Sequence, residues 1–174
     1  MSESSGKVQQ SPSLKARALR LLSLREYSRK GLAAKLQESE ARRLKLNTSN
    51  PTGDDEITVK PTSLQIEEVL NDFEARGWLS DERFAESLVR RRQERYGTRK
   101  IQEELQRAGV DAVKATELIQ GLKDSEFERA RELWVRKFGV VTQDQKERAR
   151  QYRFLASKGF AIEIVSKIVG GRGD

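Results

Sequence analysis

The sequence predicts an all-α protein built as an elongated array of three tandem three-helix repeats. Apolar residues recur three and four positions apart along most of the 174 residues, which is the spacing of amphipathic helices. The composition favours several small units over one large core, because only 36% of the residues are hydrophobic and 35% are charged. A glycine helix stop that recurs along the chain is the third observation, and it indicates a repeated architecture.

The predicted domain organisation follows the helical segments and the polar stretches between them. We expect a disordered N-terminal arm, three repeats and a short tail. The expected ranges are 1–12 for the arm, 13–77 for the first repeat with a polar insertion at 46–62, 78–122 for the second repeat, 123–170 for the third repeat and 171–174 for the tail.

The first two helices of the first repeat show a clear periodicity. The first should run over residues 14–25. Ser28 is expected to cap the second, in which Leu32 and Leu36 share one face. Gly31 lies inside this second helix, where glycine costs about 1 kcal/mol relative to alanine.

The insertion that follows is rich in Asn, Ser, Thr, Pro, Gly and Asp, which predicts a mobile loop. Residues 57–59 have the composition of a strand, but the segment is too short to predict one. Thr62 and Gln65 form a capping-box pattern that opens the third helix. Its apolar face comprises Ile66, Val69, Leu70 and Phe73.

The second repeat is predicted to begin with a helix that Ser80 or Asp81 caps. Tyr96 and the glycine after it form a corner, and Thr98 is expected to cap the next helix. The apolar residues on these two helices are Phe84, Leu88, Val89, Ile101 and Leu105.

Four further helices are expected after the second repeat's corner helix. Asp111 should cap the first of them. Ser125 with Glu128, and Thr142 with Gln145, are capping-box patterns that predict the starts of the next two. The last helix should carry Ile164, Val165, Ile168 and Val169 and end at a pair of glycines.

The recurrent glycine stop consists of an apolar residue, three other residues, glycine and a second apolar residue. In a Schellman motif, the glycine adopts the left-handed conformation and the two apolar side chains touch. The three instances are Phe73 with Gly77 and Trp78, Leu105 with Gly109 and Val110, and Leu155 with Gly159 and Phe160.

The residue types that the chain lacks exclude several kinds of chemistry. Histidine and cysteine are absent, which removes the commonest metal ligands and general base and excludes a disulfide framework. No phosphate-binding glycine loop is present, and the paired acidic residues suit solvated surfaces. We therefore expect a binding protein without catalytic residues, metal or cofactor. Because no apolar run is long enough to span a bilayer, we also expect it to be soluble and cytoplasmic.

The net charge of +7 is distributed in alternating blocks. Such alternation is less typical of a nucleic-acid coat than a continuous basic face, and it favours a partner with both acidic and basic features. The basic blocks are 7–45, 83–100 and 129–174, and the acidic blocks are 46–82 and 101–128.

The most concentrated set of cations surrounds the corner at Tyr96. We call this set the basic corner, and it is our candidate binding site. Arginine makes forked contacts with carboxylates and phosphates and also stacks on flat groups, so both nucleic acid and an acidic protein groove remain possible partners. The residues of the basic corner are Arg83, Arg90, Arg91, Arg92, Arg95, Tyr96, Arg99 and Lys100.

The order and spacing of several motifs resemble the signature of the bacterial RecX family. The resemblance extends from about Leu14 to Val169, and it is densest from Gly77 to Val110. The chain departs from the family at Gly31, where a glutamate usually precedes the leucine, and in its long insertion. The residues that match the family's structural motif are Gly77, Trp78, Asp81, Phe84, Gly97, Ile101, Leu105, Gly109, Gly159 and Phe160.

The resemblance implies a non-enzymatic regulator of the RecA recombinase in DNA repair, recombination and the SOS response. Such proteins lodge in the groove of the RecA–DNA filament and oppose ATP hydrolysis, strand exchange and LexA co-cleavage. The implied partners are the RecA nucleoprotein filament and single- or double-stranded DNA, with no membrane, and we expect a monomer. The alternative is a stand-alone DNA-binding protein with helix-turn-helix-like units. A coiled-coil scaffold fits poorly, because sustained heptads are absent.

Overall fold

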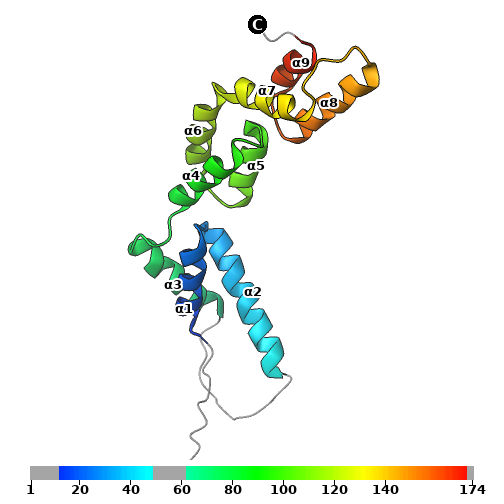
Figure 1. Ribbon diagram of the computed structural model, residues 1–174. Coiled ribbons are helices and arrows are strands. Elements are labelled where there is room, and N and C mark those ends of the chain that lie inside the picture. The colour runs from blue at the N-terminus through cyan, green and yellow to red at the C-terminus, as the bar shows by residue number, and fades with distance from the viewer. Residues whose placement is uncertain (1–11, 49–61, 172–174) are drawn as a thin grey trace, which may run out of the picture. The chain divides into compact units, whose positions relative to one another are not determined.

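The computed structural model describes residues 12–48 and 62–171. Within these ranges the chain forms nine α-helices and no β-strand, which confirms the all-α prediction (Figure 1). The chain divides into two compact units, Met1–Leu79 and Ser80–Asp174. The first unit contains α1 (Leu14–Leu24), α2 (Arg29–Thr48) and α3 (Thr62–Ala75), and the second contains α4 (Asp81–Arg92), α5 (Thr98–Arg107), α6 (Ala112–Lys123), α7 (Glu126–Lys137), α8 (Gln145–Ser157) and α9 (Ile162–Val169). No helix of the described ranges is both long and apolar enough to cross a lipid bilayer.

Each set of three consecutive helices encloses its own small core. Apolar side chains on one face of every helix are buried against the other two helices of the set, as helical periodicity predicts. The most deeply buried residues are Ala18, Leu32, Leu36, Ile66, Leu70 and Phe73 in the first core, Ala85, Ile101, Leu105 and Ala115 in the second, and Ala130, Leu155, Phe160 and Val165 in the third. Together with the repeated helix stops, these three cores give a repeat array.

Gly31 lies directly beside the cap of α2. The hydroxyl of Ser28 accepts a hydrogen bond from the backbone N–H of Gly31 at 3.0 Å, so the predicted cap is confirmed. A Cβ atom added at Gly31 would lie only 3.1 Å from that same Oγ atom. Glycine has a low helix propensity, but a larger residue here would press against the capping hydroxyl.

The helix α2 is longer than the sequence predicts. It runs through Thr48, three residues into the range expected for the insertion. The rest of that range, including the expected loop and the short segment 57–59, lies outside the described residues up to position 61.

A buried carboxylate ties α1 to α2. Glu40 is only 4% exposed, and it accepts hydrogen bonds from Nε and Nη2 of Arg43 at 3.1 and 3.0 Å. A guanidinium nitrogen of Arg17 also donates to it, while the other terminal nitrogen donates to Ser39 Oγ at 2.7 Å. Burial alone would raise the pKa of Glu40, but hydrogen bonds and charge from the two arginines outweigh burial and hold that pKa below its ordinary value.

We expect Glu40→Gln to destabilise the first unit by about 2–3 kcal/mol near neutral pH, because two partly buried guanidiniums lose their counter-charge. A depressed pKa makes the carboxylate stabilising above the pKa of the unfolded chain. That stability is lost as the pH falls through the folded pKa. The difference between parent and variant should therefore shrink below about pH 4, near the ordinary value for glutamate.

Urea unfolding followed through Trp78, in a Trp134→Phe background, measures this difference for the first unit. Glu38→Gln is the matched control, because Glu38 also pairs with two cations, Lys35 and Arg42, but at the surface. The control should change the unfolding free energy much less. Equal stability of Glu40→Gln and the parent at neutral pH would show that the network contributes nothing.

The predicted glycine stops end helices in both units. Gly77 has a φ of 70°, its N–H donates to Glu74 at 2.9 Å, and the N–H of Trp78 donates to Phe73 at 2.8 Å. The rings of Phe73 and Trp78 meet edge to face with centroids 5.3 Å apart, which is the apolar contact that often accompanies a Schellman motif. Gly109 repeats both backbone bonds, and Gly159 has a φ of 83°.

Several caps differ from the prediction. Ser80 and Asp111 cap α4 and α6 through their side chains, as expected. At the start of α8, Asp144 is the cap, because its carboxylate accepts from the N–H of Lys146 at 2.9 Å. Thr142 instead accepts from the N–H of Asp144, so the predicted capping box of Thr142 is wrong. Ser125 precedes α7 without making a capping bond, and its hydroxyl accepts a hydrogen bond from Arg129 instead.

Candidate functional site

The outer part of the basic corner lies at the end of α4 and the start of α5. Arg90, Arg95 and Arg99 are exposed, and none of their side chains forms an ion pair or hydrogen bond with another described residue. Arg91 is also exposed, but its Nε donates to the carbonyl of Ser87 at 3.2 Å. The end of α4 is the negative end of the helix dipole, so it stabilises Arg90 and Arg91, whereas Arg99 lies in the first turn of α5. The protein thus presents three uncommitted guanidiniums around one turn of chain.

The inner residues of the basic corner pack against one another. Arg92 Nε pairs with Glu104 Oε2 at 2.8 Å, and the Arg92 guanidinium lies 5.3 Å from the centroid of the Tyr96 ring. Lys158, at the end of α8, places its Nζ 5.1 Å from the same centroid. Such cation–π contacts are worth about 0.5–1 kcal/mol each at partly exposed sites. Arg92 and Tyr96 therefore hold the turn in place, whereas the outer arginines extend into solvent.

Arg83 lies at the other end of α4 from the remaining arginines. Its backbone N–H donates to the capping hydroxyl of Ser80 at 3.2 Å, and its side chain is exposed. Lys100 is partly buried on the first turn of α5. The structure thus gathers seven of the eight predicted residues around one turn and leaves Arg83 apart from them.

The turn beneath the basic corner contacts the turn between α8 and α9. The N–H of Gly97 donates to the carbonyl of Lys158 at 3.0 Å, and the N–H of Arg99 donates to the carbonyl of Gly159 at 3.2 Å. The two backbones approach so closely that a Cβ atom at Gly97 would lie 2.3 Å from the oxygen of Gly159. Glycine is therefore required at this contact. We call this contact, with the side chains of Thr98, Glu126 and Arg129 described next, the joint.

Glu126 connects the joint to α7. Its side chain is buried, and its two carboxylate oxygens accept from the N–H of Thr98 at 3.0 Å and from the Thr98 hydroxyl at 2.9 Å. Thr98 is therefore the first residue of α5 and not its cap, so that prediction is wrong. The carboxylate of Glu126 satisfies a free N–H at the start of α5, and its position in the first turn of α7 also suits the dipole of that helix.

Arg129 completes the joint with four hydrogen bonds. Nη1 donates to the carbonyls of Gln93 and Tyr96 at 2.6 and 3.0 Å, and Nη2 donates to the carbonyl of Leu122 at 3.1 Å. Nε donates to the hydroxyl of Ser125 at 3.2 Å, which explains why Ser125 does not cap α7. Burial lowers the pKa of Arg129, although the charge of Glu126 partly counters this, and the guanidinium stays protonated at any physiological pH.

Sequence reasoning missed Glu126 and Arg129. The capping-box pattern drew attention to Glu128, which is exposed, instead of Glu126 two positions earlier. Glu126 and Arg129 are an acidic and a basic residue one turn apart at a helix start. That spacing was the available signal, but such pairs are common on solvated surfaces. Their partners lie about thirty residues away in the chain, as the hydrogen bonds to Thr98 and Gln93 show.

This arrangement suits binding. Among the described residues, no group of three acidic side chains is arranged to hold a metal ion. A cationic turn that the joint fixes to three neighbouring helices is preorganised, so less conformational entropy is lost when it meets an anionic partner. Two residues of the RecX structural motif, Gly97 and Gly159, form the close contact of the joint, and Ile101, Leu105 and Phe160 are buried in the cores on either side of it.

Comparisons with known proteins identify the family. The model for the second three-helix domain of RecX matches residues 80–118, and that for the third three-helix domain matches residues 124–169. The chain is also 41% identical over 157 residues to the regulatory protein RecX of Leptothrix cholodnii, with 90% of this chain and 87% of that protein covered. The chain belongs to the RecX family. A second RecX, from Herminiimonas arsenicoxydans, is 43% identical over 153 residues, which cover 88% of each protein.

A solved RecX structure shares the fold. The crystal structure of RecX from Lactobacillus salivarius matches with a TM-score of 0.63 over 91% of this chain and 93% of that one, at 21% sequence identity. The RecX relatives carry the name of a regulatory protein and not of an enzyme. The family expected from the motifs is therefore confirmed, and the all-α repeat array is a RecX fold.

Proposed function

We propose that this RecX family member binds the filament that the RecA recombinase forms on DNA and inhibits its ATP hydrolysis, strand exchange and LexA co-cleavage. The observation that carries the proposal is the exposed set of Arg90, Arg95 and Arg99 on a turn that the joint fixes in place. The action needs no cofactor, and we expect it in the cytoplasm, where a monomer meets the filament.

The chemistry of a nucleoprotein filament fits this surface. A groove between protein and DNA presents both carboxylates and phosphates, and guanidiniums form forked, charge-assisted hydrogen bonds with either group. Repeated units that each make a modest contact add their effects when they engage one filament together. The alternating basic and acidic blocks of the sequence suit a partner that has both signs of charge.

The test is the single-stranded-DNA-dependent ATPase rate of RecA, measured over a range of concentrations of this protein. The parent should lower the rate. The triple variant Arg90→Glu, Arg95→Glu and Arg99→Glu should need roughly 10–100 times more protein for the same inhibition, because each exposed charge contributes about 0.5–1 kcal/mol. We omit Arg91 from the variant because its side chain already donates to the carbonyl of Ser87 in its own helix.

The control is a second triple variant of the same unit, Lys123→Glu, Arg131→Glu and Arg136→Glu. These side chains are exposed and lie on α6 and α7, so the net charge changes equally while the basic corner stays intact. Circular dichroism melts establish that both variants fold. If the basic-corner variant inhibits the RecA ATPase at the same concentration as the parent, the binding surface lies elsewhere. Tight, salt-sensitive binding to free DNA with no effect on RecA would support the stand-alone DNA-binding alternative.

A further inference from the structure

A groove of about 590 Å³ lies between α1 and α2 of the first unit. Its floor contains Leu36, which is fully buried, and its walls include Leu21, Leu24 and Leu46. Leu24 and Leu46 are 75% and 73% exposed, although leucine on a helix normally faces a core. The helix α2 has 20 residues against 11 in α1, so part of its apolar surface extends past its neighbour.

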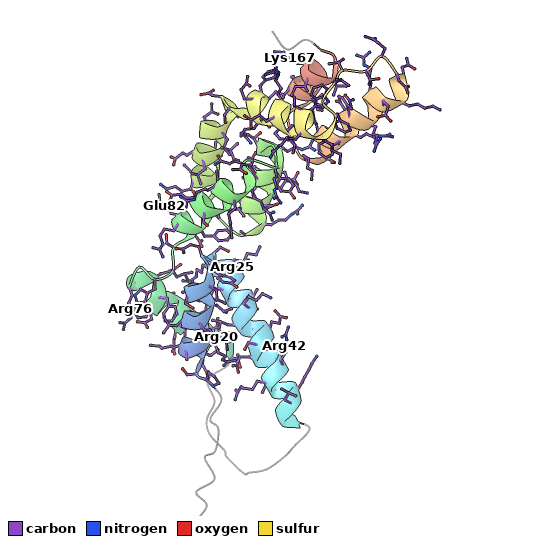
Figure 2. All side chains as sticks on the ribbon, in the orientation of Figure 1. Arg20, Arg25, Arg42, Arg76, Glu82 and Lys167 are labelled. Carbon is purple, nitrogen blue, oxygen red and sulfur yellow. The ribbon has the colours of Figure 1, made fainter. Side chains whose placement is uncertain are left out.

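Cations surround these leucines. Five arginine and lysine side chains line the groove, against a single lining carboxylate, that of Glu38. Two of the five, Arg17 and Arg43, are paired with the buried Glu40 behind the groove, which leaves three cations against Glu38. This carboxylate already pairs with Lys35 and Arg42. The side chain of Arg20 has no ion pair or hydrogen bond with any described residue. Figure 2 shows Arg20 on α1 and Arg42 on α2, the two helices that form the groove.

The combination of exposed leucines and excess positive charge specifies one kind of occupant. An apolar groove between two helices accepts a third, amphipathic helix through side chains three and four positions apart. The positive rim requires acidic residues beside that apolar stripe. Single-stranded nucleic acid fits less well, because the groove lining contains no aromatic side chain on which bases stack.

We propose that the α1–α2 groove is a docking site for an acidic amphipathic helix of a partner protein. The apolar side chains of that helix contact Leu21, Leu24 and Leu46, and its carboxylates contact Arg20 and Arg42. The groove and the basic corner share no residues. The docking proposal therefore does not depend on the partner proposed for the basic corner.

The test uses the full chain and a fluorescein-labelled synthetic helix with leucine at every third or fourth position and glutamate beside each leucine. Fluorescence anisotropy should show saturable binding. Leu24→Glu and Arg20→Glu should each weaken binding at least about tenfold, because each places a carboxylate where the peptide carries apolar or acidic groups. Val113→Glu is the matched control, because Val113 is an exposed apolar residue on α6 of the second unit. It should leave the affinity unchanged.

Several results would overturn this proposal. A peptide with lysine in place of each glutamate must not bind, since equal binding removes the role of charge. Loss of binding in Val113→Glu would make the effect non-specific. Conversion from dimer to monomer by Leu24→Glu would assign the groove to a second copy of this chain. Tighter peptide binding after deletion of residues 49–55 would assign it to the chain's own segment, and displacement of the peptide by an oligonucleotide would assign it to nucleic acid.

Discussion

Replacement of Gly97 by alanine should lower the free energy of unfolding of the second unit by about 3 kcal/mol or more. The added methyl group would lie 2.3 Å from both the oxygen of Gly159 and the nitrogen of Phe160, distances at which atoms overlap. All of these neighbours are backbone atoms, so no side chain can rotate away. Overpacking in a well-packed site usually costs about 1–3 kcal/mol, and here the two turns must also separate.

Separation of the turns would break the hydrogen bonds from Gly97 to Lys158 and from Arg99 to Gly159. Each lost bond adds about 1 kcal/mol, and more if its groups stay buried without a partner. The φ angle of Gly97 is −75°, which any residue can adopt, so the expected effect is purely steric. Gly159→Ala should be comparably severe, because its φ is 83° and its added Cβ would lie 2.5 Å from the Cβ of Lys100.

Gly121 provides the matched control for Gly97. It lies inside α6, and a Cβ atom added there would meet nothing within 4 Å. Gly121→Ala should therefore stabilise the unit by roughly 0.5–1 kcal/mol through helix propensity. Urea unfolding followed through Trp134 in a Trp78→Phe background reports on this unit alone. A Gly97→Ala variant as stable as its parent would mean that the two turns do not touch in solution.

The sequence predicts the helices well because their signals are local. The periodic apolar residues of α3, such as Ile66 and Phe73, are buried as expected, and Ser28, Ser80 and Asp111 form the expected caps. The glycine stop is also local, since it requires one backbone conformation and a contact between residues five positions apart. Each of these features is complete within about one turn of chain on either side.

The joint could not be predicted from the sequence because its partners are distant in the chain. Thr98 has the ideal side chain for a cap, yet Glu126 takes its N–H and its hydroxyl. Ser125 begins a capping box in sequence, yet its hydroxyl bonds to Arg129 instead. At Thr98 a tertiary contact replaces the local cap, since the buried carboxylate of Glu126 is stabilised by both donors. At Ser125 the replacing bond is itself local, but it is made by an arginine whose other bonds reach Gln93 and Tyr96.

The basic corner shows the same limit. Composition and spacing found its arginines, but could not separate Arg92, which pairs with Glu104, from Arg90 and Arg95, which extend into solvent. That division depends on which residue of the helix faces α5. It decides which substitutions test binding and which only disturb folding.

Arg129→Ala should destabilise the second unit by about 2–4 kcal/mol. The carbonyls of Gln93, Tyr96 and Leu122 lose their donor, and Glu126 stays buried beside Thr98 without the nearby positive charge. Glu126→Gln should cost less, about 1–2 kcal/mol, because the amide keeps one acceptor oxygen but turns an N–H₂ group towards a donor of Thr98. Unfolding followed through Trp134 in the Trp78→Phe background measures both.

Arg129→Lys separates the two contributions of this side chain. An ammonium group keeps the charge near Glu126, but it is a single point and cannot reach the three carbonyls and the Ser125 hydroxyl that the planar guanidinium spans. If geometry dominates, the lysine variant should be nearly as unstable as the alanine variant. If charge dominates, it should approach the parent in stability.

We expect geometry to dominate. Three of the four bonds go to backbone carbonyls, two that follow α4 and one at the end of α6. Only a forked group reaches both places at once. A lysine variant as stable as the parent would contradict that account of the joint.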